Sequence, residues 1–210
     1  MTRSRPDRLA SPSSESAPTT RIDGRTARSV RTRSAIVEAM LDLIEEGDLQ
    51  PTVARVAKRA GISERLIYHH FDDLESLLSA VAARQSERVI DRIRPIDPNL
   101  PLAERIEQLV EQRSRLLEWI TPFRRAALLH EPFSPALRER HDQMLAHSRD
   151  QLARLFSREL QGLDTGPRRE LLAALEATTS WPWWDAVRRA GLSRPAARRA
   201  MRRTLSALLT

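Results

Sequence analysis

The 210-residue sequence contains no cysteine, few aromatic residues and no long apolar run. The absence of cysteine excludes disulfides, cysteine nucleophiles and thiolate metal sites. No apolar stretch approaches the roughly 18 residues that a membrane-spanning helix requires. Residues 1–18 are basic and polar but lack the apolar segment of a secretory signal. We therefore expect a cytoplasmic protein without a membrane-embedded part.

The sequence also lacks the short motifs that carry common catalytic chemistries. It has no glycine-rich phosphate loop, no H-E-x-x-H zinc motif and no G-x-S-x-G nucleophile turn. Nothing in the sequence therefore supports an enzyme, and we expect neither a cofactor nor a metal site.

Lysine occurs only once, whereas arginine is abundant, and the formal net charge is +7. The positive charge lies at the two ends, since residues 1–34 carry +5, residues 185–210 carry +6 and the residues between them carry −4. Basic ends on an acidic body are typical of a protein that meets a polyanion. An arginine-rich, GC-rich genome is an equally good explanation, so charge alone does not decide the function.

The pattern of apolar residues is helical from residue 27 onward. Leucine, alanine and arginine dominate the composition, and all three favour helices. Apolar residues recur at three- and four-residue steps. We predict an all-α fold without strands, with helices over residues 27–46, 52–60, 64–71, 74–94, 101–120, 122–130, 134–160, 167–190 and 194–209.

Composition and pattern divide the chain into three parts. Residues 1–26 are rich in Ser, Thr, Pro and Arg and have too few apolar residues to form a core, so we expect a disordered basic arm. Residues 27–80 form a first domain of short helices. Residues 81–210 form a second helical domain.

Residues 52–71 have the proportions of a helix-turn-helix. Two short helices, Thr52–Ala60 and Glu64–Phe71, are joined by a tight turn at Gly61, where a Cβ would hinder the backbone. The small side chain of Ala57 lets the two helices approach. In such a unit the second helix enters the major groove of DNA and the first helix crosses the backbone.

Residues 51–78, PTVARVAKRAGISERLIYHHFDDLESLL, resemble the DNA-binding segment of the TetR (tetracycline-repressor) family of bacterial transcriptional regulators. The likeness covers about residues 30–80 and rests on Val56-Ala57, Ala60-Gly61-Ile62-Ser63, Ile67-Tyr68, His70-Phe71, Glu75 and Leu77-Leu78. It implies an N-terminal helix-turn-helix three-helix DNA-binding domain, followed by a helical domain that binds a ligand and forms a dimer.

The resemblance also implies roles for individual residues of the helix-turn-helix. Tyr68 and His69 correspond to residues that touch phosphates or thymine methyl groups. Glu64, Arg65 and Leu66 occupy the exposed start of the recognition helix, where base contacts are made. Two further expectations are that Thr52 contacts a phosphate through its hydroxyl group, and that Phe71 is core while His70 serves packing or the helix end.

Other interpretations of this segment remain open. Adjacent histidines point about 100° apart on a helix, and no carboxylate or cysteine four residues away completes a metal site. There are two alternatives to DNA contact. His69 is then plain solvent-exposed surface, and Tyr68 is an ordinary half-buried aromatic residue.

The segment departs from the family pattern at two places. Arg65 and Leu66 replace the small residues of many relatives, so we expect Arg65 to bind guanine and Leu66 to meet a thymine methyl group. Leu74 replaces a lysine that contacts phosphate in relatives. We predict that arginines before the helix-turn-helix compensate for this loss, at positions Arg25, Arg28, Arg31 and Arg33.

In the second domain, the family likeness implies an effector pocket among the middle helices and a dimer interface on the last two. The candidate ligand contacts are Trp119, Phe123, His130, Met144, His147, Trp181 and Trp184. The candidate interface residues are Leu175, Trp183, Ala197, Met201, Leu205 and Leu208. The tryptophan cluster at 181–184 fits the interface, the core or the pocket, and the arginine face of the last helix is either solvated or a second nucleic-acid surface.

The resulting prediction is a homodimeric transcriptional regulator, most often a repressor in this family. It would be released from a palindromic double-stranded DNA operator by an unknown small-molecule inducer. The alternatives are a regulator or activator that needs no effector, and a nonspecific arginine-rich nucleic-acid binder.

Overall fold

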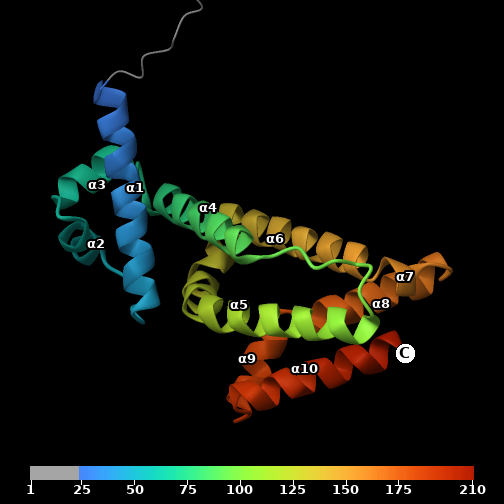
Figure 1. Ribbon diagram of the computed structural model, residues 1–210. Coiled ribbons are helices and arrows are strands. Elements are labelled where there is room, and N and C mark those ends of the chain that lie inside the picture. Colours follow the sequence, from blue (N-terminus) through green and yellow to red (C-terminus); the bar gives the residue numbers. More distant parts are fainter. Residues whose placement is uncertain (1–23) are drawn as a thin grey trace, which may run out of the picture.

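The computed structural model describes residues 24–210, and every regular element in this range is a helix (Figure 1). The predicted all-α fold class is therefore confirmed. The predicted arm lies almost wholly outside the described residues. The elements are α1 (Gly24–Glu45), α2 (Val53–Ala60), α3 (Glu64–His70), α4 (Leu74–Arg92), α5 (Leu102–His130), the short 3-10 helix η1 (Glu131–Phe133), α6 (Pro135–Leu155), α7 (Ser157–Leu160), α8 (Thr165–Thr178), α9 (Trp181–Arg189) and α10 (Arg194–Leu209).

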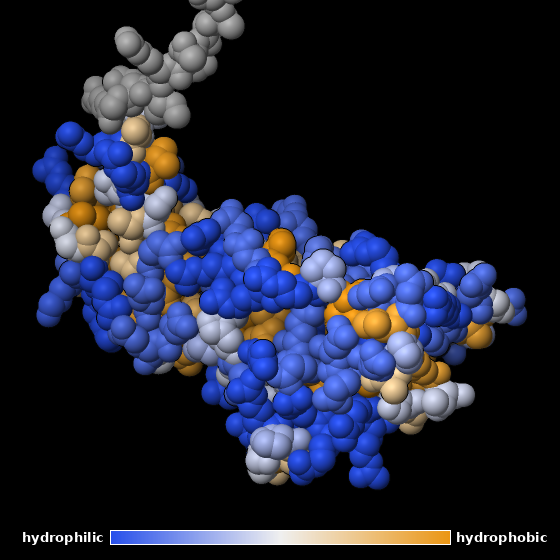
Figure 2. All heavy atoms as spheres, in the orientation of Figure 1, coloured by the Kyte–Doolittle hydropathy of each residue, from blue (hydrophilic) through white to orange (hydrophobic). Residues whose placement is uncertain are grey.

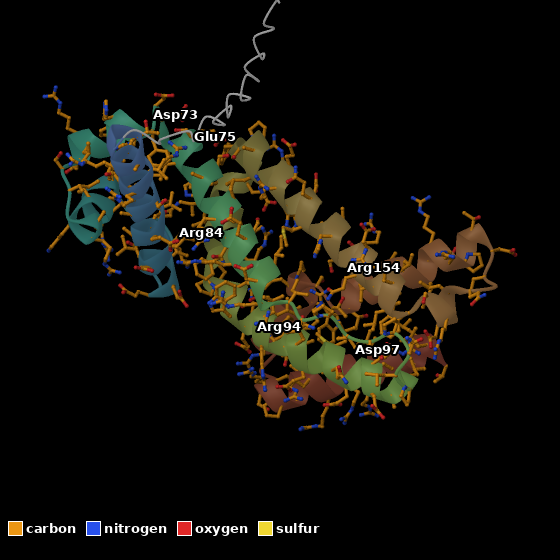
Figure 3. All side chains as sticks on the ribbon, turned by 45° about the horizontal axis from the view of Figure 1, so that its top comes forward. Asp73, Glu75, Arg84, Arg94, Asp97 and Arg154 are labelled. Carbon is orange, nitrogen blue, oxygen red and sulfur yellow. The ribbon has the colours of Figure 1, made fainter. Side chains whose placement is uncertain are left out.

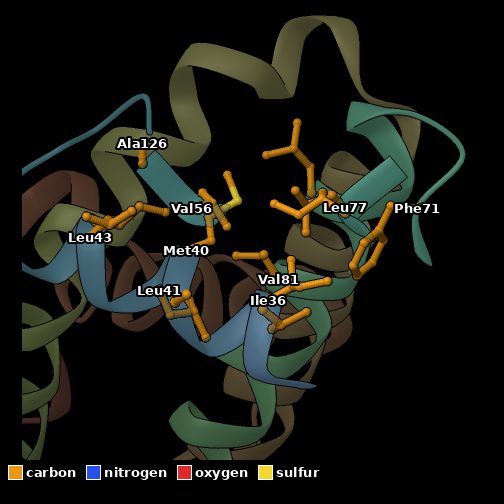
Figure 4. Packing of buried hydrophobic residues seen from close by; sticks show 14 of the residues in the cluster. Ile36, Met40, Leu41, Leu43, Val56, Phe71, Leu77, Val81 and Ala126 are labelled. Carbon is orange, nitrogen blue, oxygen red and sulfur yellow. The ribbon is translucent and has the colours of Figure 1, made fainter. Parts of the chain in front are cut away.

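Helices α1, α2 and α3 form the N-terminal end of the molecule (Figure 1). The Thr52 side chain caps α2 by accepting a hydrogen bond from the backbone N–H of Arg55. Gly61 ends α2 in the left-handed conformation, with φ of 68°, which a residue with a Cβ rarely adopts. The apolar stripe of α1 packs on Val56, Leu77 and other buried residues of the neighbouring helices (Figure 4).

Helix α4 connects this end to the rest of the molecule. Asp73 and Ser76 form a capping box at its start, so the chain turns sharply out of α3 into α4. Near this start Glu75 accepts a hydrogen bond of 2.6 Å from the Ser134 hydroxyl group ahead of α6, and further along Arg84 pairs with Glu38 of α1 (Figure 3). The predicted boundary between residues 80 and 81 falls inside α4, which packs on both α1 and α6.

The remaining helices share a second core. It includes the fully buried side chains of Leu109, Phe156, Leu175, Trp184 and Met201. In Figure 1, α10 lies beside α5 on the side of the molecule away from α3.

Three predicted helix boundaries in this region are wrong. One helix, α5, runs through Pro122, because the residues on both sides of it, including Leu117 and Phe123, continue one buried stripe whose packing outweighs the lost backbone hydrogen bond. The predicted helix over 134–160 is interrupted at Phe156, whose side chain is fully buried. The predicted helix over 167–190 is divided into α8 and α9 by Thr179 and Ser180.

Pro182 explains why the new helix α9 begins where it does. The Ser180 side chain caps α9, and Pro182 lies in its first turn, where no intrahelical donor is needed. The break between α8 and α9 therefore lies just before the proline.

The visible surface is largely hydrophilic, with small apolar patches between the helices (Figure 2). Over the described range, no helix is both long and apolar enough to cross a membrane.

Candidate DNA-binding surface and cavity

Helix α3 has one buried side and one exposed side. Ile67 and, just after the helix, Phe71 are each 2% exposed and hold it against α1 and α2. The opposite side presents Glu64, Arg65 and His69 as exposed side chains, with Tyr68 60% exposed. Leu66 is half-buried. An exposed aromatic side chain beside charged and imidazole groups, on a short helix at the rim of the molecule, suits contact with a partner surface.

Three other predicted contact positions, Thr52, Arg28 and Arg31, also have exposed side chains. Thr52 is exposed, and its hydroxyl group remains able to donate to a phosphate while it accepts the capping hydrogen bond of 3.3 Å. Arg28 and Arg31 are exposed on α1. Leu74 is 52% exposed at the start of α4.

Arg33 has a structural role that the sequence did not indicate. Its guanidinium donates a hydrogen bond of 2.6 Å to the backbone carbonyl of His70 and lies 4.0 Å from the centre of the Phe71 ring. It therefore fixes the end of α3 to α1. Burial lowers the pKa of His70, with smaller contributions from His69 and Arg33.

Ion pairs distinguish the basic residues of this region. Arg55 pairs with Asp48 at 2.8 Å, and Arg59 pairs with Glu46 at 2.5 Å. Within the described part of the chain, Arg65 takes part in no ion pair. Its exposed guanidinium is therefore available to an external acceptor.

A cavity of about 320 Å³ lies between α1, α4, α5 and α6 and reaches the start of α9. Most of its wall is apolar, and the α1 residues Met40, Leu41 and Ile44 form the part next to the helix-turn-helix. This volume is at the lower end of the range typical of small-molecule pockets.

The structure brings four of the seven predicted ligand contacts to the cavity wall: Phe123, His130, Met144 and Trp181. The other three lie elsewhere. Trp119 donates a hydrogen bond to Glu45 of α1 and has the Arg92 guanidinium 3.6 Å from its ring centre. Trp184 is buried in the second core, and His147 is half-buried on α6. The binding roles of all seven remain predictions.

Two polar lining residues that the sequence analysis did not select are Arg113 and Gln85. A signal for both was present in the sequence. Arg113 continues the apolar series of Leu109 and Val110, and Gln85 continues that of Val81, at helical spacing. A polar residue inside a buried stripe points to a special environment.

The predicted dimer residues lie mostly within the fold of one chain. Leu175, Ala197, Met201 and Leu205 are fully buried in the second core. Trp183 and Leu208 are half-buried and retain exposed surface. The role of these residues in an interface remains a prediction.

Comparison with known proteins bears on the N-terminal segment first. Residues 36–81 match the family model for bacterial regulatory proteins of the tetR family. The chain is 32% identical over 94 residues to the HTH-type transcriptional regulator AlkX of Mycobacterium tuberculosis, and 31% identical over 83 residues to the regulator BetI of Klebsiella pneumoniae. The first match covers 44% of this chain and 44% of the relative, and the second covers 37% and 42%. The chain thus matches less than half the length of either relative.

Solved structures extend the likeness to the whole fold. A tetR-family transcriptional regulator from Streptomyces coelicolor has a TM-score of 0.65 and 20% identity, over 85% of this chain and 80% of that one. A transcriptional regulator from Rhodococcus sp. Rha1 has a TM-score of 0.63 and 22% identity, over 86% and 95%. At these identities the likeness establishes the fold. Together, these comparisons show that residues 36–81 match the tetR family of bacterial regulatory proteins and that the chain as a whole has the fold of regulators from that family.

Proposed function

We propose that this chain is a sequence-specific DNA-binding transcriptional regulator that acts as a homodimer and responds to a small molecule. The observation that carries the proposal is the exposed face of α3, with Arg65 unpaired among the described residues and Tyr68 beside it. Arg65 binds a guanine edge, Tyr68 and His69 contact the backbone or a thymine methyl group, and Thr52 contacts a phosphate.

The dimer forms through the accessible side of α10. Its residues Ala196, Ala200, Thr204 and Leu208 recur at four-residue steps and are all half-buried, whereas the alternate side packs on α5. Small side chains on this side allow close approach of a second copy. A two-fold pair places the two α3 helices at half-sites about one turn of DNA apart.

The cavity is the effector site, and repression is its proposed outcome. Its wall includes residues of α1 and α4, which belong to the same core as the helix-turn-helix. A ligand that fits one arrangement of these helices better than the other shifts the spacing of the two recognition helices, and operator affinity changes accordingly. The protein acts by binding, in the cytoplasm, and not by catalysis.

The test is to incubate the full chain with fragmented genomic DNA from its source at about 100 mM salt and to sequence the retained fragments. We expect a palindromic motif that is lost in the Arg65→Ala and Tyr68→Ala double variant. Uniform retention of all sequences would instead support a nonspecific arginine-rich binder. The matched control is Arg115→Ala, which removes an exposed arginine of α5.

A further inference from the structure

Two arginines are buried on the same helix, in opposite surroundings. Arg105 is 2% exposed and its guanidinium donates to both carboxylate oxygens of Glu159, at 2.8 and 2.5 Å, and to the Leu155 carbonyl. Arg113 is 6% exposed and donates only to the Ser148 hydroxyl group at 3.1 Å and the Gln151 side-chain oxygen at 2.8 Å. Both of these acceptors are neutral.

Arg113 thus carries a buried charge without a counter-ion. No carboxylate of the described residues pairs with it, and its Nε has no acceptor among them. Burial lowers the pKa of Arg113 to about 10, which leaves the guanidinium protonated at neutral pH. A buried charge that lacks an opposite charge is costly, and an anion beside it would relieve that cost.

Gln85 of α4 provides an independent sign of a missing polar partner. It lines the same cavity as Arg113, and both its side-chain nitrogen and its side-chain oxygen are buried without a partner in residues 24–210. Buried amide groups are normally hydrogen-bonded. A ligand group that accepts hydrogen bonds would satisfy the Arg113 guanidinium, and it would satisfy the Gln85 amide N–H where it also reaches α4, since both residues line this cavity.

The carboxylates of the cavity wall do not fill this role, because they are paired elsewhere. Glu131 pairs with Arg124 at 3.2 Å, and Glu176 pairs with Arg149 at 2.8 Å. A cationic ligand would therefore meet positive charges without an ion-pair partner among the described residues, at the buried Arg113 and the half-buried Arg140, and no uncompensated negative one.

The cavity is elongated and has polar side chains at both ends. Arg113 lies at one end, whereas Arg124 and Glu131 at the other end compensate each other as an ion pair. On α5 its wall runs from Arg113 to His130, which corresponds to about 25 Å of helix. Helix α5 begins on the side away from α1 and ends beside it (Figure 1), so Arg113 lies far from the helix-turn-helix while Met40 and Ile44 of α1 line the near end. A volume of about 320 Å³ spread over such a length suits a slender apolar body.

We propose that the effector is an amphipathic monoanion, whose single carboxylate pairs with Arg113 and accepts a hydrogen bond from Gln85. Its unbranched apolar body extends along α5 toward Met40 and Ile44 of α1. This inference rests on the proposed effector site and specifies the chemistry that the site selects. It also explains how a head group far from α3 is coupled to the helix-turn-helix, because the apolar end of the same molecule contacts α1.

The test compares three probes that share one chain length and differ in head group: decanoate, decanol and decyltrimethylammonium. Binding to the full chain is measured by calorimetry below the concentration at which each probe aggregates. We expect decanoate to bind roughly tenfold or more tightly than decanol, because its head forms charge-assisted hydrogen bonds, and we expect no binding of decyltrimethylammonium.

The decisive variant is Arg113→Met, with Arg115→Met as the matched control because Arg115 is exposed on the same helix. Arg113→Met should reduce decanoate affinity to that of decanol and leave decanol affinity unchanged, whereas Arg115→Met should change neither. Gln85→Leu is a second variant that leaves the Arg113 charge in place. It should weaken the binding of decanoate several-fold and leave the binding of decanol unchanged.

Equal affinity of the wild-type chain for decanoate and decanol would overturn the carboxylate inference and leave the effector site standing. A preference for decanoate over decanol that persists in the Arg113→Met variant would likewise overturn the carboxylate inference. Failure of all three probes to bind would overturn the inference. If the genomic DNA selection still yields a motif in that case, the failure would also count against the cavity as the effector site.

Discussion

Arg105 and Arg113 show at the scale of single residues how one side-chain type serves two purposes on one buried helix face. Arg105 is neutralised by Glu159 and joins α5 to α7. Arg113 has only neutral partners and faces a cavity. Helical spacing places both residues in an apolar stripe, but the sequence does not reveal which of them has a carboxylate partner, because Glu159 is distant along the chain.

Removal of the carboxylate at Glu159 should destabilise the protein strongly. The Glu159→Gln variant leaves the Arg105 charge buried without compensation, and we expect the free energy of unfolding to fall by about 3 kcal/mol. Urea denaturation followed by circular dichroism measures this change. Glu104→Gln, an exposed position in the first turn of α5, is the control and should change stability by less than about 0.5 kcal/mol.

The Arg113→Met variant without ligand should behave in the opposite way. Because the charge it removes has no counter-ion, we expect its free energy of unfolding to be equal to or higher than that of the wild type. A loss of more than about 2 kcal/mol in the same denaturation experiment would contradict the assignment of Arg113 as an uncompensated buried charge.

His141 should make stability depend on pH. Its pKa is lowered by burial first and by the nearby Arg124 second, against smaller opposing contributions from Glu131 and Asp142. The unfolded chain therefore takes up a proton more readily than the folded chain, and stability falls as the pH is lowered from about 7 to 5. Thermal unfolding should show a smaller fall in His141→Gln, whereas Gln143→Ala, exposed on the same helix, should retain the full fall.

At the scale of helices, the elements with strong local signals could be predicted best. The predicted end of the first helix-turn-helix helix at Ala60, before Gly61, and the predicted start at Leu74, after Asp73, agree with α2 and α4 of the structure. The errors fall where tertiary packing outweighs local preference. Pro122 predicts a break that the buried stripe of α5 overrides, and the buried Phe156 interrupts a pattern that predicts a continuous helix.

The cap at Asp73 offers a test of this local control. Asp73→Ala removes the acceptor of a 2.7 Å hydrogen bond from the Ser76 backbone N–H, and we expect a loss of about 1 kcal/mol in the free energy of unfolding. The adjacent Asp72→Ala is the control, since Asp72 is exposed and does not cap the helix. Equal effects in chemical denaturation would mean that general charge, and not the cap, matters here.

At the scale of the whole molecule, the helix-turn-helix could be predicted from the sequence, but the lining of the cavity could not. Phe71 is buried and Tyr68 is exposed, as the family resemblance implies. The cavity wall draws residues from six α-helices that are far apart in sequence. The stripe of α10 around Met201 is apolar enough for an interface, yet the structure packs it on α5 of the same chain, and only three-dimensional packing distinguishes these uses.

The proposed dimer surface can be tested by one substitution on its accessible side. Ala200→Arg introduces a long charged side chain among small residues, and we expect the protein to sediment as a monomer in analytical ultracentrifugation and to lose operator binding. Ala146→Arg, at an exposed position of α6, should remain dimeric. A dimeric Ala200→Arg protein would place the interface elsewhere.

The most direct measurement of the central claim, that α3 reads base sequence, is a double-mutant cycle between Arg65 and the selected operator. Affinities of the wild type and Arg65→Ala are measured on the operator and on operators with each half-site guanine replaced in turn, at one salt concentration. We predict that Arg65→Ala costs about 1–3 kcal/mol on the operator and almost nothing once its partner guanine is replaced. A cost that is the same on every operator would contradict the claim, because it would mean that Arg65 contacts only the phosphate backbone.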